Sequence, residues 1–131
     1  MAFADAVADV VTALAATTGI DRAYSEPPQS VNEPGTIAIV ELESYNPYFT
    51  IDGVSHEAVL RVYVLKAPIN ADQAKADLLP VIAAVTTKFR SAAPTNADYW
   101  LLQPGAEVGD FERNNTIYYG FSQLLKLVGN F

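Results

Sequence analysis

The sequence has no cysteine, a single histidine, and eight basic residues against fifteen acidic ones. The lack of cysteine excludes disulfides, thiolate metal sites and a cysteine nucleophile, and one histidine alone argues against a transition-metal site. The formal net charge of −7 argues against a duplex-binding surface, because such affinity depends mainly on neutralising phosphates. We therefore expect no metal, and no specific binding of DNA.

Apolar runs and glycine motifs are also missing. No apolar run approaches the roughly 20 residues needed to span a bilayer, so no membrane contact is expected. The segment MAFADAVADVV is interrupted by Asp5 and Asp9 and has no basic region, unlike a signal peptide. The seven glycines are scattered singly and form neither a phosphate-binding loop nor a dinucleotide fingerprint, so no cofactor is expected.

The length predicts one domain, residues 1–131. A domain of this size buries roughly two thirds of the surface that its unfolded chain exposes. A hydrophobic core without cross-links is therefore expected, in a chain that folds in a reducing cytoplasm.

Two amphipathic helices are predicted. Apolar residues recur at helical spacing over residues 3–17, and Gly19 is placed to end this helix. The second helix follows Asn70, a candidate N-cap, and its buried stripe comprises Leu78, Ile82, Val85 and Phe89. Pro80 lies within this helix and removes a backbone hydrogen bond, which predicts a kink or a split into two helices.

A long hairpin is predicted between the two helices. Its first strand starts at Thr36 and is expected to break at Asn46-Pro47, because proline cannot donate to a β-ladder and usually marks a bulge or an edge. Asp52-Gly53 between apolar flanks predicts a tight turn, and the return strand runs to about Lys66.

Three further strands follow, over residues 99–103, residues 108–112 and a long final run after a turn at residues 113–115. The final run alternates well between two faces. The order of elements predicts an α+β fold. It consists of one small domain whose mixed or antiparallel sheet carries a long projecting β-hairpin and is covered on one face by the two helices.

The return strand is apolar on both faces apart from Arg61, and one layer of helices covers only one of them. The second face therefore meets either solvent or another subunit, which indicates oligomerisation. Aromatic residues also crowd the predicted break and turn, where burial within one subunit is harder, although core packing stays open for them. The candidate protein-interface residues are Tyr45, Tyr48, Phe49, Val59, Tyr63 and Leu65.

Few residues are candidates for catalysis. Glu41 and Glu43 are two positions apart on one strand, about 6.5 to 7 Å, a separation compatible with an inverting glycosidase. A solvated face or the wall of a pore is favoured for them, because nothing else in the sequence forms a sugar site. His56 allows a Ser-His-Asp arrangement in principle, but no nucleophile elbow accompanies it, and a surface position near the hairpin turn is favoured. We expect no enzymatic activity.

A leading helix is followed by PGTIAIVELES with AVLRVYVLKAP, by ADQAKADLLPVIAAVTTKFRSA and by NNTIYYGFSQLLKLV. This order of elements, which covers nearly the whole chain, resembles the tail terminator family of long-tailed bacteriophages and the related proteins that join tail to head. The prolines at residues 25–35 and Pro80 depart from a simple version of this pattern.

The resemblance implies a virion structural protein, made and assembled in the host cytoplasm. It implies a ring, usually hexameric, that caps the tail tube, ends its polymerisation and presents a docking surface to the head. The implied partners are further copies of the chain, the tail tube protein and a head-neck connector protein. DNA then passes through the lumen without specific binding, and acidic side chains repel its phosphates. The candidate lumen residues are Asp5, Asp9, Glu41 and Glu43.

Two alternatives remain open at the level of sequence. One is a head-side connector subunit of the same kind of phage neck. The other belongs to a different class, a small α+β ligand-binding or enzymatic domain whose sheet and long helix enclose a pocket.

Overall fold

The computed structural model describes residues 3–25, 35–50, 53–66, 71–113 and 116–130. Within these ranges it has two helices and six strands. In chain order they are α1 (Phe3–Ala15), β1 (Arg22–Tyr24), β2 (Thr36–Thr50), β3 (Gly53–Lys66), α2 (Ala71–Ser91), β4 (Tyr99–Leu102), β5 (Glu107–Arg113) and β6 (Thr116–Gly129).

The strands form one mixed sheet in the order β1-β2-β3-β6-β4, and β5 also pairs with β6. Only the pairing of β1 with β2 is parallel, whereas β2–β3, β3–β6, β4–β6 and β5–β6 are antiparallel. Strands β4 and β5 pair with different halves of β6: β4 lies beside residues 125–128 and β5 beside residues 116–122. The expected α+β class is confirmed, but β1 was not predicted.

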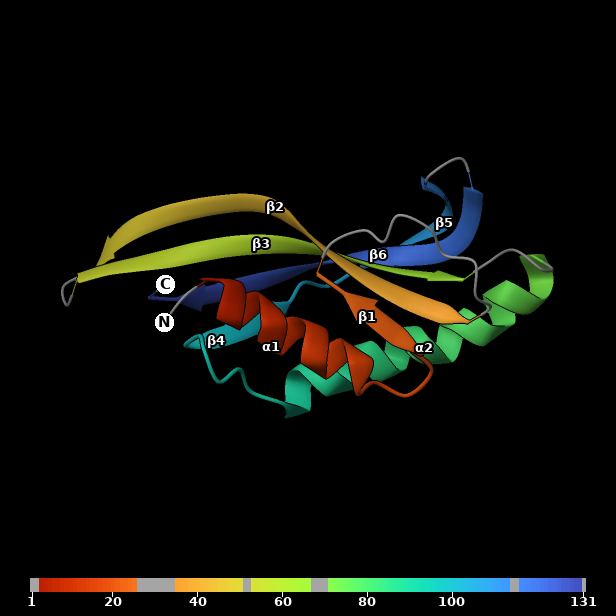
Figure 1. Ribbon diagram of the computed structural model, residues 1–131, viewed down its shortest axis with the longest axis horizontal. Helices are drawn as coiled ribbons and strands as arrows, with labels where there is room; N and C mark the ends of the chain where they lie inside the picture. The colour runs from red at the N-terminus through yellow and green to blue at the C-terminus, as the bar shows by residue number, and fades with distance from the viewer. Residues whose placement is uncertain (1–2, 26–34, 51–52, 67–70, 114–115, 131) are drawn as a thin grey trace.

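Both helices cover the same face of the sheet, as Figure 1 shows. The strands alternate, so every second side chain points toward the helices and joins the main core. From the sheet, this core takes Ala38, Val40, Ala58, Leu60, Val62, Val64, Phe121, Leu125 and Leu127. The helices contribute Val10, Leu14, Leu78, Val81, Val85 and Phe89. The stripe predicted for the second helix therefore faces the core, although Ile82 is only partly buried.

The β2–β3 hairpin is paired from Thr36 with Lys66 to Thr50 with Gly53. The predicted break at Asn46-Pro47 is wrong, because both residues belong to β2 and pair with Glu57 and His56 of β3. Pro47 does lie where β2 is an edge of the described sheet, since β1 pairs only with Ile37–Ile39. The irregularity is instead a register shift between Leu42 and Ser44, where one extra residue is inserted into β2. Gly53 belongs to β3, and the two residues between the strands lie outside the described residues.

Helix α2 is a single element, with Pro80 inside it. The predicted split is wrong for a simple reason. Pro80 and Ala76, whose carbonyl loses its helical partner, both lie on the exposed side of the helix. Water can therefore satisfy that carbonyl, and the core-facing side stays intact. The candidate N-cap Asn70 lies outside the described residues.

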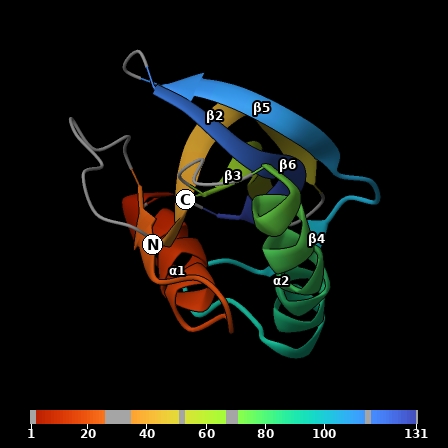
Figure 2. The same ribbon diagram turned by 90° about the vertical axis from the view of Figure 1, so that its right-hand side faces the viewer.

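The sheet curls strongly, as the end-on view in Figure 2 shows. Strand β5 and the first half of β6 lean over the face of the sheet that the helices leave uncovered. A second, smaller core fills this curl and comprises Ile37, Ile39, Leu65 and Tyr118, with Tyr24, Tyr63 and Phe111 packed against it. The expectation that the second face meets only solvent or a neighbour is thus wrong at this end of the sheet.

Candidate functional site

Three of the predicted interface residues lie on the second face of β3. Leu65 is fully buried in the second core, so it is not available to a neighbouring subunit. Tyr63 is half-buried, and its ring meets Phe111 edge-on with 5.6 Å between centroids. Val59 is also half-buried, opposite Lys126 of β6. The curl of the sheet therefore covers Leu65 and part of Tyr63, two of the residues that sequence reasoning assigned to a partner.

The aromatic residues of the hairpin do not form one cluster that the structure describes. Tyr45 turns toward the helical side, where its ring lies edge-on to Phe3 of α1 at 5.1 Å. Its hydroxyl oxygen is 2.8 Å from Nδ1 of His56, so the histidine pairs with a phenol. Tyr45 thus connects the hairpin to α1, and His56 contacts Tyr45 from the other strand of the hairpin. The side chains of Tyr48 and Phe49 lie outside the described residues.

A polar strip crosses the second face beside the second core. It consists of Glu43, Arg61, Glu107 and Ser122. Arg61 Nε donates to Glu43 Oε2 at 3.2 Å, and its Nη1 donates to Ser122 Oγ at 3.2 Å. The Glu43 carboxylate raises the pKa of Arg61, chiefly through this hydrogen bond. The strip is therefore a network of paired charges.

The four candidate lumen carboxylates do not converge. Glu41 lies opposite Arg61 in the β2–β3 register, and Glu43 occupies the shifted position of β2. The register shift means that the regular alternation assumed for a glycosidase pair does not hold between them. Asp5 and Asp9 belong to α1, on the helical side of the sheet.

Asp9 has a structural role. Its Oδ2 accepts hydrogen bonds from the backbone nitrogens of Thr95 and Asn96 at 3.0 and 2.7 Å, and the Asn96 side chain donates to Oδ1 at 3.1 Å. These bonds tie α1 to the segment between α2 and β4. Asp9 is therefore no longer a good candidate for a lumen lining, because its carboxylate is already used inside the chain.

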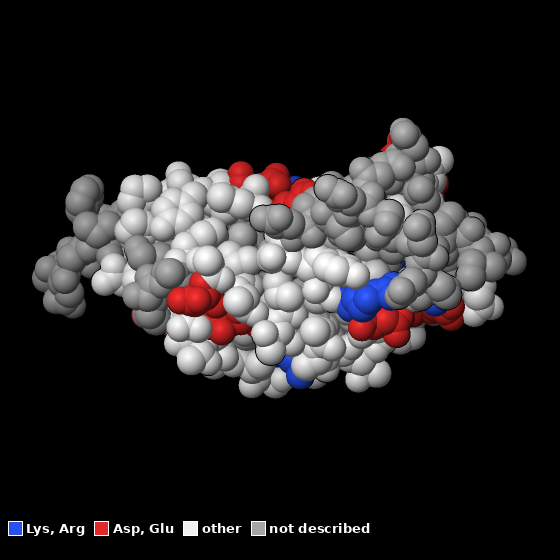
Figure 3. All heavy atoms as spheres, in the orientation of Figure 1, with Lys and Arg blue, Asp and Glu red and all other residues white. Residues whose placement is uncertain are grey.

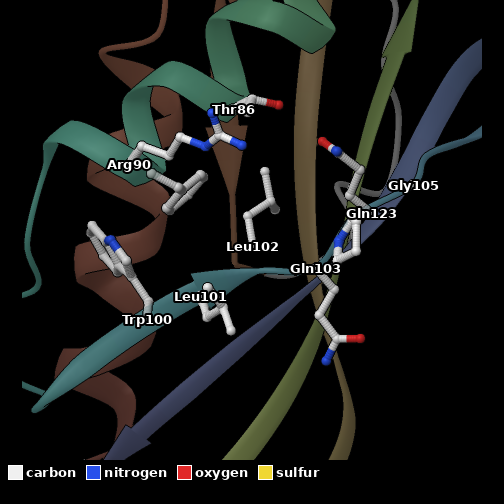
Figure 4. Close-up of a pocket in the computed structure, with 10 residues that line it drawn as sticks. Thr86, Arg90, Trp100, Leu101, Leu102, Gln103, Gly105 and Gln123 are labelled. Carbon is white, nitrogen blue, oxygen red and sulfur yellow. The ribbon is translucent and has the colours of Figure 1, made fainter.

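A pocket lies between α2 and β4. The sequence left open a pocket enclosed by the sheet and the long helix, but it identified none of the residues that line this one. Its volume is about 550 Å³, within the range of small-ligand sites. Apolar walls come from Phe89, Trp100 and Leu102, and polar groups come from Thr86, Arg90, Gln103 and Gln123. Figure 4 shows Thr86 and Arg90 on α2, Trp100 and Leu102 on β4, and Gln123 on β6 around this pocket.

The walls of this pocket are firmly held. The rings of Phe89 and Trp100 meet edge-on with 5.0 Å between centroids. Trp100 Nε1 donates to the Ala92 carbonyl at 2.9 Å, which fixes the indole.

The one sequence signal for the pocket is Gln123. It is a polar residue on the helix-facing side of β6, between Phe121 and Leu125, where alternation calls for an apolar side chain.

A smaller hollow of about 280 Å³ lies next to the pocket and reaches the polar strip. Gln103, Pro104, Gly105 and Gln123 line both. The segment from Gln103 to Gly105 therefore separates the two hollows, and the Gln103 nitrogen anchors it by donating to Leu124 O at 2.8 Å.

Within the described part of the chain, no three histidine, aspartate or glutamate residues gather as a metal-binding group would require. The helices there include none that is long and apolar enough to cross a membrane.

The chain matches no protein-family model and has no significant match among curated proteins. The resemblance to tail terminators therefore stays a prediction.

Proposed function

We propose that this chain is a virion structural protein that forms a ring, caps the tail tube of a long-tailed bacteriophage and provides the docking surface for the head. The proposal starts from the resemblance in the order of elements along nearly the whole chain. In this proposal the ring is a hexamer, its partners are the tail tube protein and a head-neck connector protein, and DNA passes through the lumen.

The observation that carries the proposal is the open sheet with two dissimilar edges. The short parallel strand β1 ends the described sheet on one side, and β4 and β5 end it on the other. Tyr99 on β4 and Val108 on β5 expose 47% and 49% of their surface at that edge. Because the β1 edge and the β4–β5 edge differ, one edge can meet the other edge of the next copy in a head-to-tail contact. Such contacts close into a ring when the rotation between neighbouring copies divides a full turn evenly.

The projecting hairpin adds a second contact element. In Figure 1, β2 and β3 extend beyond α1 and α2 at one end of the molecule. Strand β6 pairs with β3 as far as His56, so the tip of the hairpin, where Tyr48–Thr50 pair with Gly53–Ser55, extends beyond the sheet and can contact a neighbouring subunit or the tube below. The face shown in Figure 3 carries its acidic residues in separate groups, with a broad area between them that has no charged side chain. Such an area is suited to contact with another protein.

Native mass spectrometry and sedimentation at rising protein concentration test the ring. We expect a six-fold assembly, and Tyr99→Ser or Val108→Ser should weaken it because each removes apolar area from the β4–β5 edge. Leu79→Ser is the matched control, since Leu79 exposes 57% of its surface on α2, away from this edge. A chain that stays monomeric at high concentration, and also in the presence of purified tail tubes, would contradict the proposal.

The head-side connector remains the second candidate within the same class. Binding to purified tail tubes supports the terminator, whereas binding only to DNA-filled heads supports the connector. A ligand-binding domain is the candidate from another class, and the pocket beside α2 is the observation that favours it.

A further inference from the structure

We infer that the pocket between α2 and β4 binds the C-terminal residue of a peptide. The carboxylate of the peptide pairs with Arg90, its last peptide group pairs with Gln123, and its apolar side chain packs against Phe89, Trp100 and Leu102. This inference does not rest on the proposed ring, because each single chain contains the whole pocket.

Gln123 is the first observation. It exposes only 6% of its surface, and its Oε1 has no hydrogen-bond partner among the described residues. It lies opposite Val62 of β3, on the side of the sheet that packs against the helices. A buried amide oxygen without a partner is costly, because it has lost water and gained nothing in return. The Gln123 amide therefore does not stabilise the empty protein, and this points to a ligand as its partner.

The direction of the Gln123 side chain supports this. Figure 4 shows it reaching from β6 toward the side of the pocket where Thr86 and Arg90 project from α2, whereas the Gln103 amide points away from them. The Thr86 hydroxyl donates to the Ile82 carbonyl at 3.1 Å, so its hydrogen is already used within the helix. Gln123 and Arg90 are therefore the polar groups of this wall that a ligand can engage.

Arg90 supplies the charge. It is exposed in the last turn of α2 and forms no ion pair with any residue that the structure describes. In a chain of net charge −7, an unpaired arginine beside a pocket with apolar walls is suited to an anion that carries an apolar body. Guanidinium groups bind carboxylates through two parallel hydrogen bonds, which adds direction to the attraction.

A peptide end fits these groups better than a simple fatty or aromatic acid. The Gln123 amide carries both a donor and an acceptor, and a peptide group offers both in return. Rotation about the terminal bonds of the side chain brings the buried Gln123 oxygen to a ligand in the pocket. The volume of about 550 Å³ accommodates one or two residues of a chain.

Trp100 makes the test direct, because it is the only tryptophan in the sequence and forms a wall of the pocket. The probe is acetyl-Ala-Ala-Leu with a free carboxylate, titrated into the full chain while tryptophan emission is recorded. The same peptide with an amidated C-terminus lacks the negative charge, and acetyl-leucine lacks the preceding residues. We expect saturable binding of the acid peptide, with about tenfold weaker binding of the amide.

Two variants separate the contributions. Arg90→Gln should weaken the acid peptide about tenfold and leave the amide unchanged. Lys88→Gln is its control, because it removes the same charge from the same helical turn but does not line the pocket. Gln123→Leu should weaken both peptides and raise the Tm of the empty protein by roughly 4 °C, since a buried oxygen without a partner is removed.

The inference is overturned if the folded protein shows no saturable change in emission up to millimolar peptide, or if Arg90→Gln and Lys88→Gln behave alike. Equal affinity for acetyl-leucine would overturn the peptide and assign the pocket to a small carboxylic acid. The oligomeric state of each variant is measured in parallel. Loss of peptide binding in an intact ring rejects this inference alone, and peptide binding by a strict monomer rejects the ring alone.

Discussion

Gly109 of β5 and Gly120 of β6 lie directly opposite each other in the antiparallel register, yet only Gly120 is pressed against another backbone. A Cβ atom at Gly120 would overlap the carbonyl oxygen of Val64 and approach a methyl group of Leu65. A Cβ atom at Gly109 would meet nothing within 4 Å. The close approach at Gly120 is what allows β6 to follow β3 through the curl of the sheet.

Gly120→Ala should therefore destabilise the fold by about 3 kcal/mol, because a backbone carbonyl cannot move aside as a flexible side chain can. Gly109→Ala should change the free energy of unfolding by less than about 1 kcal/mol in either direction. Urea unfolding of the two variants measures the difference. Equal costs for the two alanines would show that the close approach at Gly120 does not hold.

Asp9→Ala should cost about 2 kcal/mol in the free energy of unfolding, because the backbone donors of Thr95 and Asn96 lose a charged acceptor. Asp5→Ala on the same helix is the control. Asp5 is exposed in the first turn of α1, so its removal should cost only about 0.5 kcal/mol through the helix dipole. Thermal unfolding compares them, and a cost for Asp9→Ala as small as that of Asp5→Ala would argue against the anchoring role.

Asp77 should make stability depend on pH in the acid range. Lys66 Nζ donates to Asp77 Oδ2 at 2.9 Å and Gln73 Nε2 donates to Oδ1 at 2.8 Å, and these bonds lower the pKa of Asp77. Because the folded pKa lies below the ordinary value of 3.8, the contribution is present above that pH and is lost as the pH falls through the folded pKa.

Thermal unfolding of the wild type and Asp77→Asn across this range tests the effect. The two should differ near neutral pH and converge in acid. Lys66→Met should return the pKa of Asp77 toward its ordinary value, which an NMR titration of the carboxylate can follow. A constant difference between wild type and Asp77→Asn at every pH would contradict the expectation.

Trp100→Phe should cost about 1 to 2 kcal/mol, because the Ala92 carbonyl loses its indole donor while most of the aromatic packing against Phe89 remains. Trp100→Ala should cost about 3 to 5 kcal/mol, since it also opens a cavity in the core. Tyr99→Phe, one position away and exposed, should be neutral. Urea unfolding followed by circular dichroism measures all three, and a neutral Trp100→Phe would show that the indole bond adds no stability.

Much of the fold followed from local patterns. The helical stripe that includes Leu78, Val85 and Phe89 predicted which face of α2 is buried, and the alternation along β6 predicted a long strand. Strand β1 escaped prediction because its three residues, Arg-Ala-Tyr, carry no periodic signal, and it forms only by pairing with β2. Of the two outcomes predicted for the proline in α2, a kink or a split, the split is wrong, because the cost of a proline depends on exposure, which spacing alone does not give.

The candidate sites were less predictable. The two apolar faces of its strand predicted Leu65 as an interface residue, but the curl of the sheet buries it beneath β5 and β6. The sequence gives no sign that Asp9 differs from the other acidic positions, but a segment more than 80 residues further along the chain supplies its hydrogen-bond donors. Such contacts join distant parts of the chain, and no local pattern contains them.

The sequence by itself determined the small single-domain α+β class, the two helices, the long hairpin and the lack of cysteine chemistry, because composition and periodicity act locally. Only the tertiary structure decided that the sheet curls over its own second face, and that Arg90 and Gln123 meet at one pocket with Trp100 as its wall. Twist, bulge and strand order set these outcomes, and they depend on how all the elements pack at once.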